Sequence, residues 1–152
     1  MTALALIKAG IKSPVKPDLR DEIWLKLWGN LSFNPVSVLA PGTLAELARD
    51  ESARSVLRAM MVEAQAVGEA LGARFPVNVD ERMDMAAKVG AHRTSMLQDF
   101  DAGRPIELDA LLGVVIELAQ IQGIATPALK LVYDLVRFRV RPGAVEPSNG
   151  RH

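Results

Sequence analysis

The sequence predicts an all-α fold, a multi-helix bundle without a β-sheet. Apolar residues recur at intervals of three and four along most of the chain, which is the spacing of helices with one buried face. Glycine, proline and short polar residues divide the chain into segments of helical length, and no segment is a convincing strand. Of the 152 residues, 49% are hydrophobic and 24% are charged, which favours one globular domain over a disordered chain.

The first long helix is expected to begin at Pro17-Asp18 and to lie at the centre of the bundle, because nearly its whole circumference is apolar. One polar stripe interrupts it, since Lys26, Asn30 and Asn34 are four residues apart and therefore share a face. Pro35 follows directly, so we expect the helix to kink or break near Asn34. A polar stripe that ends at a broken helix suggests the floor of a binding site. The alternative is that Lys26 extends into solvent and the asparagines cap neighbouring segments.

Residues that suit helix N-caps stand before the next expected helices, at Thr43, at Asp50 or Ser52, and at Asp80. Thr43 and Glu46 have the spacing of a capping box, which satisfies two backbone N–H groups at a helix start. The helix after Asp50 carries a long apolar stripe, and Glu63 is interpreted as a residue at the boundary of that stripe. The helix after Asp80 is expected to span residues 81–89.

Residues 92–113 are expected to form a tight corner between two helices. Ser95–Asp99 begins the first of them, and Gly103 suits the positive φ that ends a helix. The second, Leu108–Gln122, is the most apolar helix and should be buried. Gly113 inside it costs about 1 kcal/mol relative to alanine, which indicates close approach of another helix or a ligand. The last helix is expected to start at Thr126-Pro127, with Thr126 as its cap.

The composition excludes several functional classes. Lys+Arg and Asp+Glu number 18 each, so the net charge is 18 − 18 = 0, which argues against a nucleic-acid-binding surface. Without cysteine there is no disulfide or thiolate nucleophile, and two histidines, at positions 92 and 152, do not make a His-rich metal site, so no metal is expected. No apolar run reaches the roughly 18–20 residues that span a bilayer, and the start lacks the features of a signal peptide. We therefore expect no membrane partner and a cytoplasmic location.

Four sequence motifs occur together in this chain, separated by characteristic distances. They are WLKLWGNLSFNPVSVL at Trp24–Leu39, S-M-L-Q-D at residues 95–99, A-G-R-P-x-E-x-D from Ala102, and ATPALKLVYDLV at Ala125–Val136. Together they resemble the C-terminal helical domain of the 2-dehydropantoate 2-reductase (ketopantoate reductase) family. That domain is helical and is similar to the C-terminal domain of 6-phosphogluconate-dehydrogenase-like enzymes. The resemblance implies that residues 1–17 are a remnant of a preceding domain and that 18–140 form the helical domain; residues 141–152 are expected to be a disordered tail.

The resemblance also implies an activity, the NADPH-dependent reduction of 2-dehydropantoate or a related 2-keto acid in pantothenate biosynthesis. Lys26 would supply a proton or a positive charge to the ketone oxygen, and Glu107 would bind the substrate hydroxyl and complement the lysine. Ser95 would contact the substrate carboxylate. The other implied substrate-binding residues are Asn30, Asn34 and His92, which stands where family members commonly carry an asparagine. From the residues alone, Ser95 is equally well a helix N-cap and Glu107 a plain acid at a helix start.

One expected part of such a reductase has no counterpart here. The family binds NADP(H) mainly through a G-x-G-x-x-[GA] turn after a strand, and this sequence has neither that turn nor a βαβ unit. One interpretation is a substrate-binding and catalytic domain that is inactive without a separate nucleotide-binding domain. The alternative is a non-catalytic helical dimerisation or interaction module that kept the fold. We also expect a homo-oligomer, because Leu4–Ile11 and the apolar helices leave apolar surface to cover.

Overall fold

The computed structural model describes residues 7–10 and 18–141, and within these ranges every regular element is a helix, so the all-α prediction is confirmed. Most of the segments 1–17 and 141–152 lies outside the described residues, as do the expectations made for them. The helices are α2 (Leu19–Leu39), α3 (Leu44–Arg49), α4 (Glu51–Ala70), α5 (Val79–Val89), α6 (Ser95–Asp101), the π-helical turn η1 (Asp109–Gly113), α7 (Val114–Ile121) and α8 (Pro127–Arg139). Among the described residues, no helix combines the length and the apolar character needed to cross a membrane.

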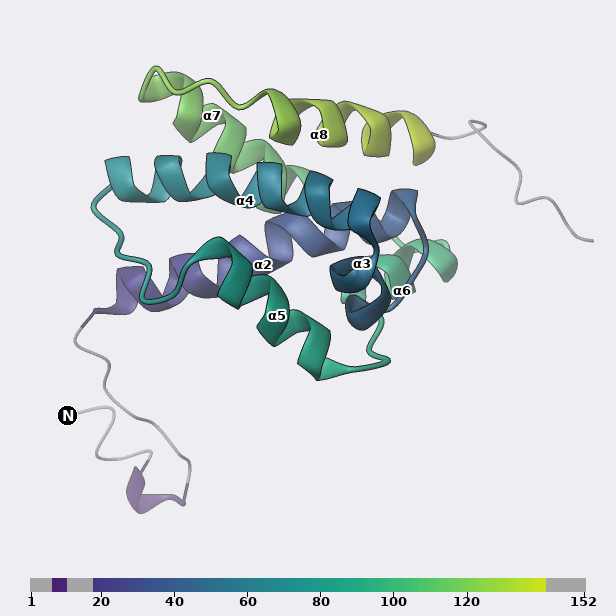
Figure 1. Ribbon diagram of the computed structural model, residues 1–152, viewed down its shortest axis with the longest axis horizontal. Coiled ribbons are helices and arrows are strands. Elements are labelled where there is room, and N and C mark those ends of the chain that lie inside the picture. Colours follow the sequence, from purple (N-terminus) through teal and green to yellow (C-terminus); the bar gives the residue numbers. More distant parts are fainter. Residues whose placement is uncertain (1–6, 11–17, 142–152) are drawn as a thin grey trace, which may run out of the picture.

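Two long helices, α2 and α4, form the centre of the bundle. They pack against each other, and α8 lies along α4 on the side away from α5, with α7 next to it (Figure 1). On the other side, α5 packs against α3 and α4, while α6 packs against α2. One end of α2 is therefore enclosed on several sides, and its polar stripe faces the region where α5 and α6 approach.

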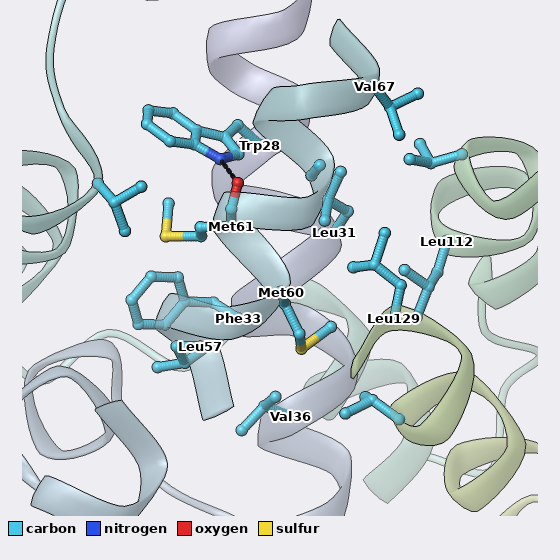
Figure 2. Close-up of a cluster of buried hydrophobic side chains, with 14 of the residues drawn as sticks. Trp28, Leu31, Phe33, Val36, Leu57, Met60, Met61, Val67, Leu112 and Leu129 are labelled. Carbon is cyan, nitrogen blue, oxygen red and sulfur yellow. Dashed lines mark hydrogen bonds between the residues drawn. The ribbon is translucent and has the colours of Figure 1, made fainter. Parts of the chain in front are cut away.

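The core lies between α2, α4, α7 and α8, where large apolar side chains meet (Figure 2). Trp28, Leu31, Met60 and Leu129 are fully buried in it. The one polar atom of the Trp28 side chain, Nε1, donates a hydrogen bond to the carbonyl oxygen of Met61 at 2.7 Å. A buried indole N–H without a partner would destabilise the fold, so this bond also fixes how α2 and α4 are aligned.

A second close contact between α2 and α4 is made possible by a glycine. A Cβ added to Gly68 would lie 2.8 Å from Cζ of Phe75 and 3.0 Å from Cε3 of Trp24, well inside normal contact distance. Phe75 also packs edge-on against Trp28, with ring centroids 4.7 Å apart. The aromatic cluster therefore occupies the space that a side chain at Gly68 would need.

Of the expected kink or break near Asn34, the break is wrong, because helix α2 continues through Pro35 to Leu39. Pro35 removes one backbone N–H from the helix, but every residue from 31 to 38 is buried. Packing against α4, α6 and α8 outweighs the local preference, as it does for most helices in proteins. The stripe of Lys26, Asn30 and Asn34 therefore lies on one uninterrupted helix.

The starts of the middle helices agree with the sequence pattern in two cases and differ in one. The capping box of Thr43 at α3 and the cap of α4 by Asp50 are confirmed. Helix α5 begins earlier than expected, because Asn78 and not Asp80 is its N-cap. Asn78 forms a second capping box with Glu81, and Asp80 lies in the first turn, where a carboxylate favours the helix dipole.

The start of α8 is capped from another helix. Thr126 occupies the cap position but accepts no hydrogen bond with its side chain, so the prediction that it caps α8 is wrong. The carboxylate of Glu63 on α4 accepts hydrogen bonds from the backbone N–H groups of Ala128 at 2.8 Å and Leu129 at 2.9 Å. The Glu63 carboxylate of the neighbouring helix α4 thus caps α8 in place of the Thr126 side chain.

The corner after α6 has the expected glycine and one unexpected feature. Gly103 has φ +66°, as expected for the residue that ends a helix. The helix after it starts with the π-helical turn η1 and then continues as α7. A Cβ at Gly113 would lie 3.5 Å from Cε2 of Tyr133, an ordinary van der Waals contact, so the expected unusually close approach is not found there. The Tyr133 hydroxyl donates to Oδ1 of Asp109 at 2.6 Å, which joins α8 to η1.

Candidate functional site

A cavity of about 280 Å³ lies where α2, α5 and the segment leading into α6 meet. Its polar lining consists of Asn30, Asn34, Arg82, His92, Thr94 and Ser95. Apolar atoms of α2, α3 and α5 complete the walls. The fold thus brings together four candidate site residues from two distant parts of the chain, together with an arginine that the sequence analysis did not select.

The asparagine stripe forms one wall of this cavity. The Asn34 side chain is 8% exposed, and neither it nor Asn30 makes a side-chain hydrogen bond with any residue of the described ranges. The amide atoms of Asn34 are not fully enclosed, because among the described residues the buried side-chain N and O atoms without a partner are confined to Nε of Arg139. The expectation that the asparagines cap neighbouring segments is therefore not met, and both amides are available to a molecule in the cavity.

A chain of hydrogen bonds joins the two walls behind the asparagines. The Ser37 hydroxyl donates to the carbonyl oxygen of Asn34 at 2.7 Å and lies 2.6 Å from the hydroxyl of Thr94. Thr94 accepts in turn from the backbone N–H of Leu97 and is the N-cap of α6. Because Thr94 is the cap, the alternative that Ser95 caps this helix is wrong. Ser95 is instead the first residue of α6, and its position relative to Asn34 is fixed through Thr94 and Ser37.

Lys26 lies in a neighbouring cavity. That cavity, of about 290 Å³, is lined by Lys26 together with Glu22, Leu25, Val77, Arg82 and Met85. The Lys26 side chain is exposed, as the alternative interpretation of the stripe expects. Arg82 lines both cavities, so the lysine and the asparagines lie on either side of one guanidinium group.

Arg82 is the residue that sequence reasoning missed. Its guanidinium group packs onto the backbone of Gly29, where an added Cβ would overlap Nη2 and lie 3.1 Å from Cζ. Burial lowers the pKa of Arg82 below the usual range of arginine. The available signal was Gly29 itself, because a glycine inside a long apolar helix is costly and indicates a close neighbour.

Glu107 lies apart from these cavities. It is exposed, it precedes η1, and it lines neither the cavity of Asn34 nor that of Lys26. The described residues therefore bring Asn30, Asn34, His92 and Ser95 together, place Lys26 next to them and leave Glu107 outside.

Two features typical of dinucleotide and metal sites are not found among the described residues. These residues include no strand that leads into a glycine-rich turn, which the pyrophosphate of NADP(H) requires. Nor do residues 18–141 contain a group of three or more His, Cys, Asp or Glu side chains that could hold a metal. What the cavity does offer is amide, hydroxyl, imidazole and guanidinium groups, which suit a small polar molecule with an anionic group.

A helical bundle with such a cavity is a candidate small-molecule-binding domain. Residues 18–140 match the family model described as "Ketopantoate reductase PanE/ApbA C terminal". The chain is 53% identical over 137 residues to a 2-dehydropantoate 2-reductase of Mesorhizobium japonicum, an alignment that covers 90% of this chain and 42% of that protein. It is 30% identical over 131 residues to a 2-dehydropantoate 2-reductase of Nostoc, covering 86% and 41%. The chain belongs to the ketopantoate reductase family and corresponds to its C-terminal helical domain.

Solved structures share the fold. A ketopantoate reductase of the PanE/ApbA family from Ralstonia eutropha superposes with a TM-score of 0.83 at 28% identity, covering 91% of this chain and 47% of that one. The 2-dehydropantoate 2-reductase of Methylococcus capsulatus gives a TM-score of 0.80 at 30% identity, covering 92% and 46%. A D-mandelate dehydrogenase solved with NADH has the same fold, with a TM-score of 0.79 at 21% identity. The chain spans less than half the length of the curated relatives it matches.

Proposed function

We propose that this chain is the substrate-binding and catalytic domain of an NADP(H)-dependent reductase that acts on 2-dehydropantoate or a related 2-keto acid. One observation carries the proposal: Asn30, Asn34, His92 and Ser95 line a single cavity, and Lys26 lies in the adjacent one. Lys26, Asn30, Asn34 and Ser95 stand in the motifs that resemble those of the family, whereas His92 stands where members commonly carry an asparagine. Asn34 lines the cavity and makes no side-chain hydrogen bond with the described residues, which supports binding of a polar ligand over a purely structural role.

The proposed chemistry of these residues follows from their functional groups. Reduction of a ketone builds negative charge on its oxygen, and the ammonium group of Lys26 would stabilise that charge and donate the proton. The amides of Asn30 and Asn34 would hydrogen-bond the substrate, and the Ser95 hydroxyl would contact its carboxylate. Glu107 would bind the substrate hydroxyl in the complete site. Because no dinucleotide site is present in the described residues, we propose that NADP(H) is held by a separate nucleotide-binding domain and that this chain alone is inactive.

A second proposal concerns self-association, which is supported by exposed apolar side chains on α7 and α8. Ile121 is 75% exposed, Leu131 61% and Phe138 57%, so these helices carry apolar surface that a second copy could cover. A related ketopantoate reductase from Staphylococcus aureus is described as dimeric. We propose a homo-oligomer, acting in the cytoplasm, in which the substrate cavity remains open. A purely non-catalytic dimerisation module is the alternative to the reductase proposal.

Substrate binding by the purified chain tests the main proposal. Titration with 2-dehydropantoate, followed by calorimetry and by NADPH oxidation, should show binding without turnover. Asn34→Ala and Lys26→Ala should weaken binding, whereas Lys88→Ala, which removes an exposed lysine from α5 outside both cavities, should not. Absence of binding, or binding that all three variants retain, would favour the dimerisation module. Turnover that disappears in Lys26→Ala would show that the chain is active alone.

A further inference from the structure

Arg82 differs from every other arginine in the described part of the chain. Each of the others has a hydrogen bond, an ion pair or an aromatic ring as a partner. The Arg82 side chain has none among the described residues, although it is partly buried. A partly buried cation without a counter-charge loses part of its hydration, so an anionic ligand that supplies the missing charge is favoured there.

The neighbouring carboxylates of α5 do not compensate Arg82 because they are engaged elsewhere. Asp80 pairs with Arg58 at 3.4 Å, and Asp84 pairs with Arg54 at 3.0 Å. Glu81 caps its own helix through Asn78. Glu22 lines the cavity of Lys26 together with Arg82 and is not without a partner. Burial alone accounts for the lowered pKa of Arg82, with no contribution from a neighbouring carboxylate. The Arg82 side chain therefore lines both cavities without a counter-charge from α5.

The position of the guanidinium group is fixed by Gly29. Its Nη2 overlaps the position of a Cβ at residue 29, so the flat group is held against α2 beside Asn30. Ser95 and Asn34 line the same cavity as Arg82, and Lys26 lines the cavity on its other side. A ligand in contact with these residues would meet the planar N–H groups of Arg82, which match the two oxygens of a carboxylate.

We propose that Arg82 binds the carboxylate of the 2-keto acid substrate and makes the site selective for anions over neutral ketones. This inference rests on the proposed function and adds a specificity-determining residue to the same cavity. Gly29 is the positioning residue, because its missing side chain leaves the space that Arg82 occupies. Ser95 would then contact a carboxylate that Arg82 already holds from the wall formed by α5.

The test compares an acid with its uncharged counterpart. Calorimetric titration of the chain with 2-dehydropantoate and with its neutral amide should give tighter binding of the acid. Arg82→Gln should lower affinity for the acid by about 10- to 100-fold and leave affinity for the amide within about twofold. Arg82→Lys, which keeps the charge but loses the planar pair of donors, should give an intermediate loss for the acid alone.

The matched control is Arg58→Gln, an exposed arginine of α4 that lines neither cavity, and it should bind both compounds like the parent. Equal losses for acid and amide in Arg82→Gln would overturn the inference, since they would indicate a structural role. An unchanged affinity for the acid would overturn it as well, while leaving the proposed function intact. A parent chain that binds neither compound would overturn both.

Discussion

Removing the carboxylate of Glu63 is expected to loosen α8 from the bundle. Glu63→Ala deletes two hydrogen-bond acceptors that serve the backbone N–H groups of Ala128 and Leu129. Loss of a helix cap costs about 0.5–2 kcal/mol, and a buried N–H left without a partner costs about 1–3 kcal/mol. Leu129 is fully buried, whereas Ala128 is partly exposed and can recruit water. The expected loss in the free energy of unfolding is therefore roughly 2–3 kcal/mol.

Urea denaturation followed by far-ultraviolet circular dichroism and tryptophan fluorescence measures this loss. Glu63→Gln keeps one acceptor and should lose roughly half as much. The control is Glu117→Ala, which removes an exposed glutamate from α7 that has no partner among the described residues, and it should stay within about 0.5 kcal/mol of the parent. If Glu63→Ala unfolds at the same urea concentration as this control, the carboxylate does not stabilise the start of α8 and the reasoning is refuted.

Three further outcomes are expected. Gly68→Ala should destabilise the fold by about 1–3 kcal/mol, because its Cβ would meet Phe75 at 2.8 Å; a melting temperature equal to that of the parent would contradict this. Hydrogen bonds from Arg74, led by its backbone N–H, lower the pKa of Asp21, so its contribution to stability is present above about pH 4 and lost as the pH falls through the folded-state pKa. Asp21→Asn should therefore flatten the loss of stability between about pH 5 and about pH 2 in urea titrations, and an unchanged profile would count against it. Light scattering should show an oligomer at micromolar concentration; a monomer would refute the proposed self-association.

Much of the helical framework could be predicted because its signals are local. The capping box at Thr43, the cap at Asp50 and the glycine that ends α6 each depend on residues within one turn. The failed expectations share a different cause. Pro35 stays inside α2, and Glu63 replaces Thr126 as the cap of α8, because contacts with other helices outweigh the local preference.

The candidate site shows the same division. The motif match selected Asn30, Asn34, His92 and Ser95, and the fold places them around one cavity. Arg82 could not be selected from local patterns, because its contact with Gly29 depends on how α5 packs against α2. The two residues are far apart in the sequence. A glycine inside a helix indicates a close neighbour. At Gly29 that neighbour is the guanidinium group of Arg82.

The π-helical turn η1 makes the orientation of Glu107 depend on the number of residues between it and α7. Val115, Ile116 and Ala119 fix the buried face of α7, and η1 separates them from Glu107. A π turn contains one residue more than an α turn, and one residue corresponds to a rotation of about 100° around a helix axis. Deleting one residue between 109 and 113 would restore a regular α-helix and turn Glu107 toward another side of the bundle while α7 stayed in place. Relatives could therefore reorient the Glu107 carboxylate by an insertion or deletion within η1, more readily than by a substitution.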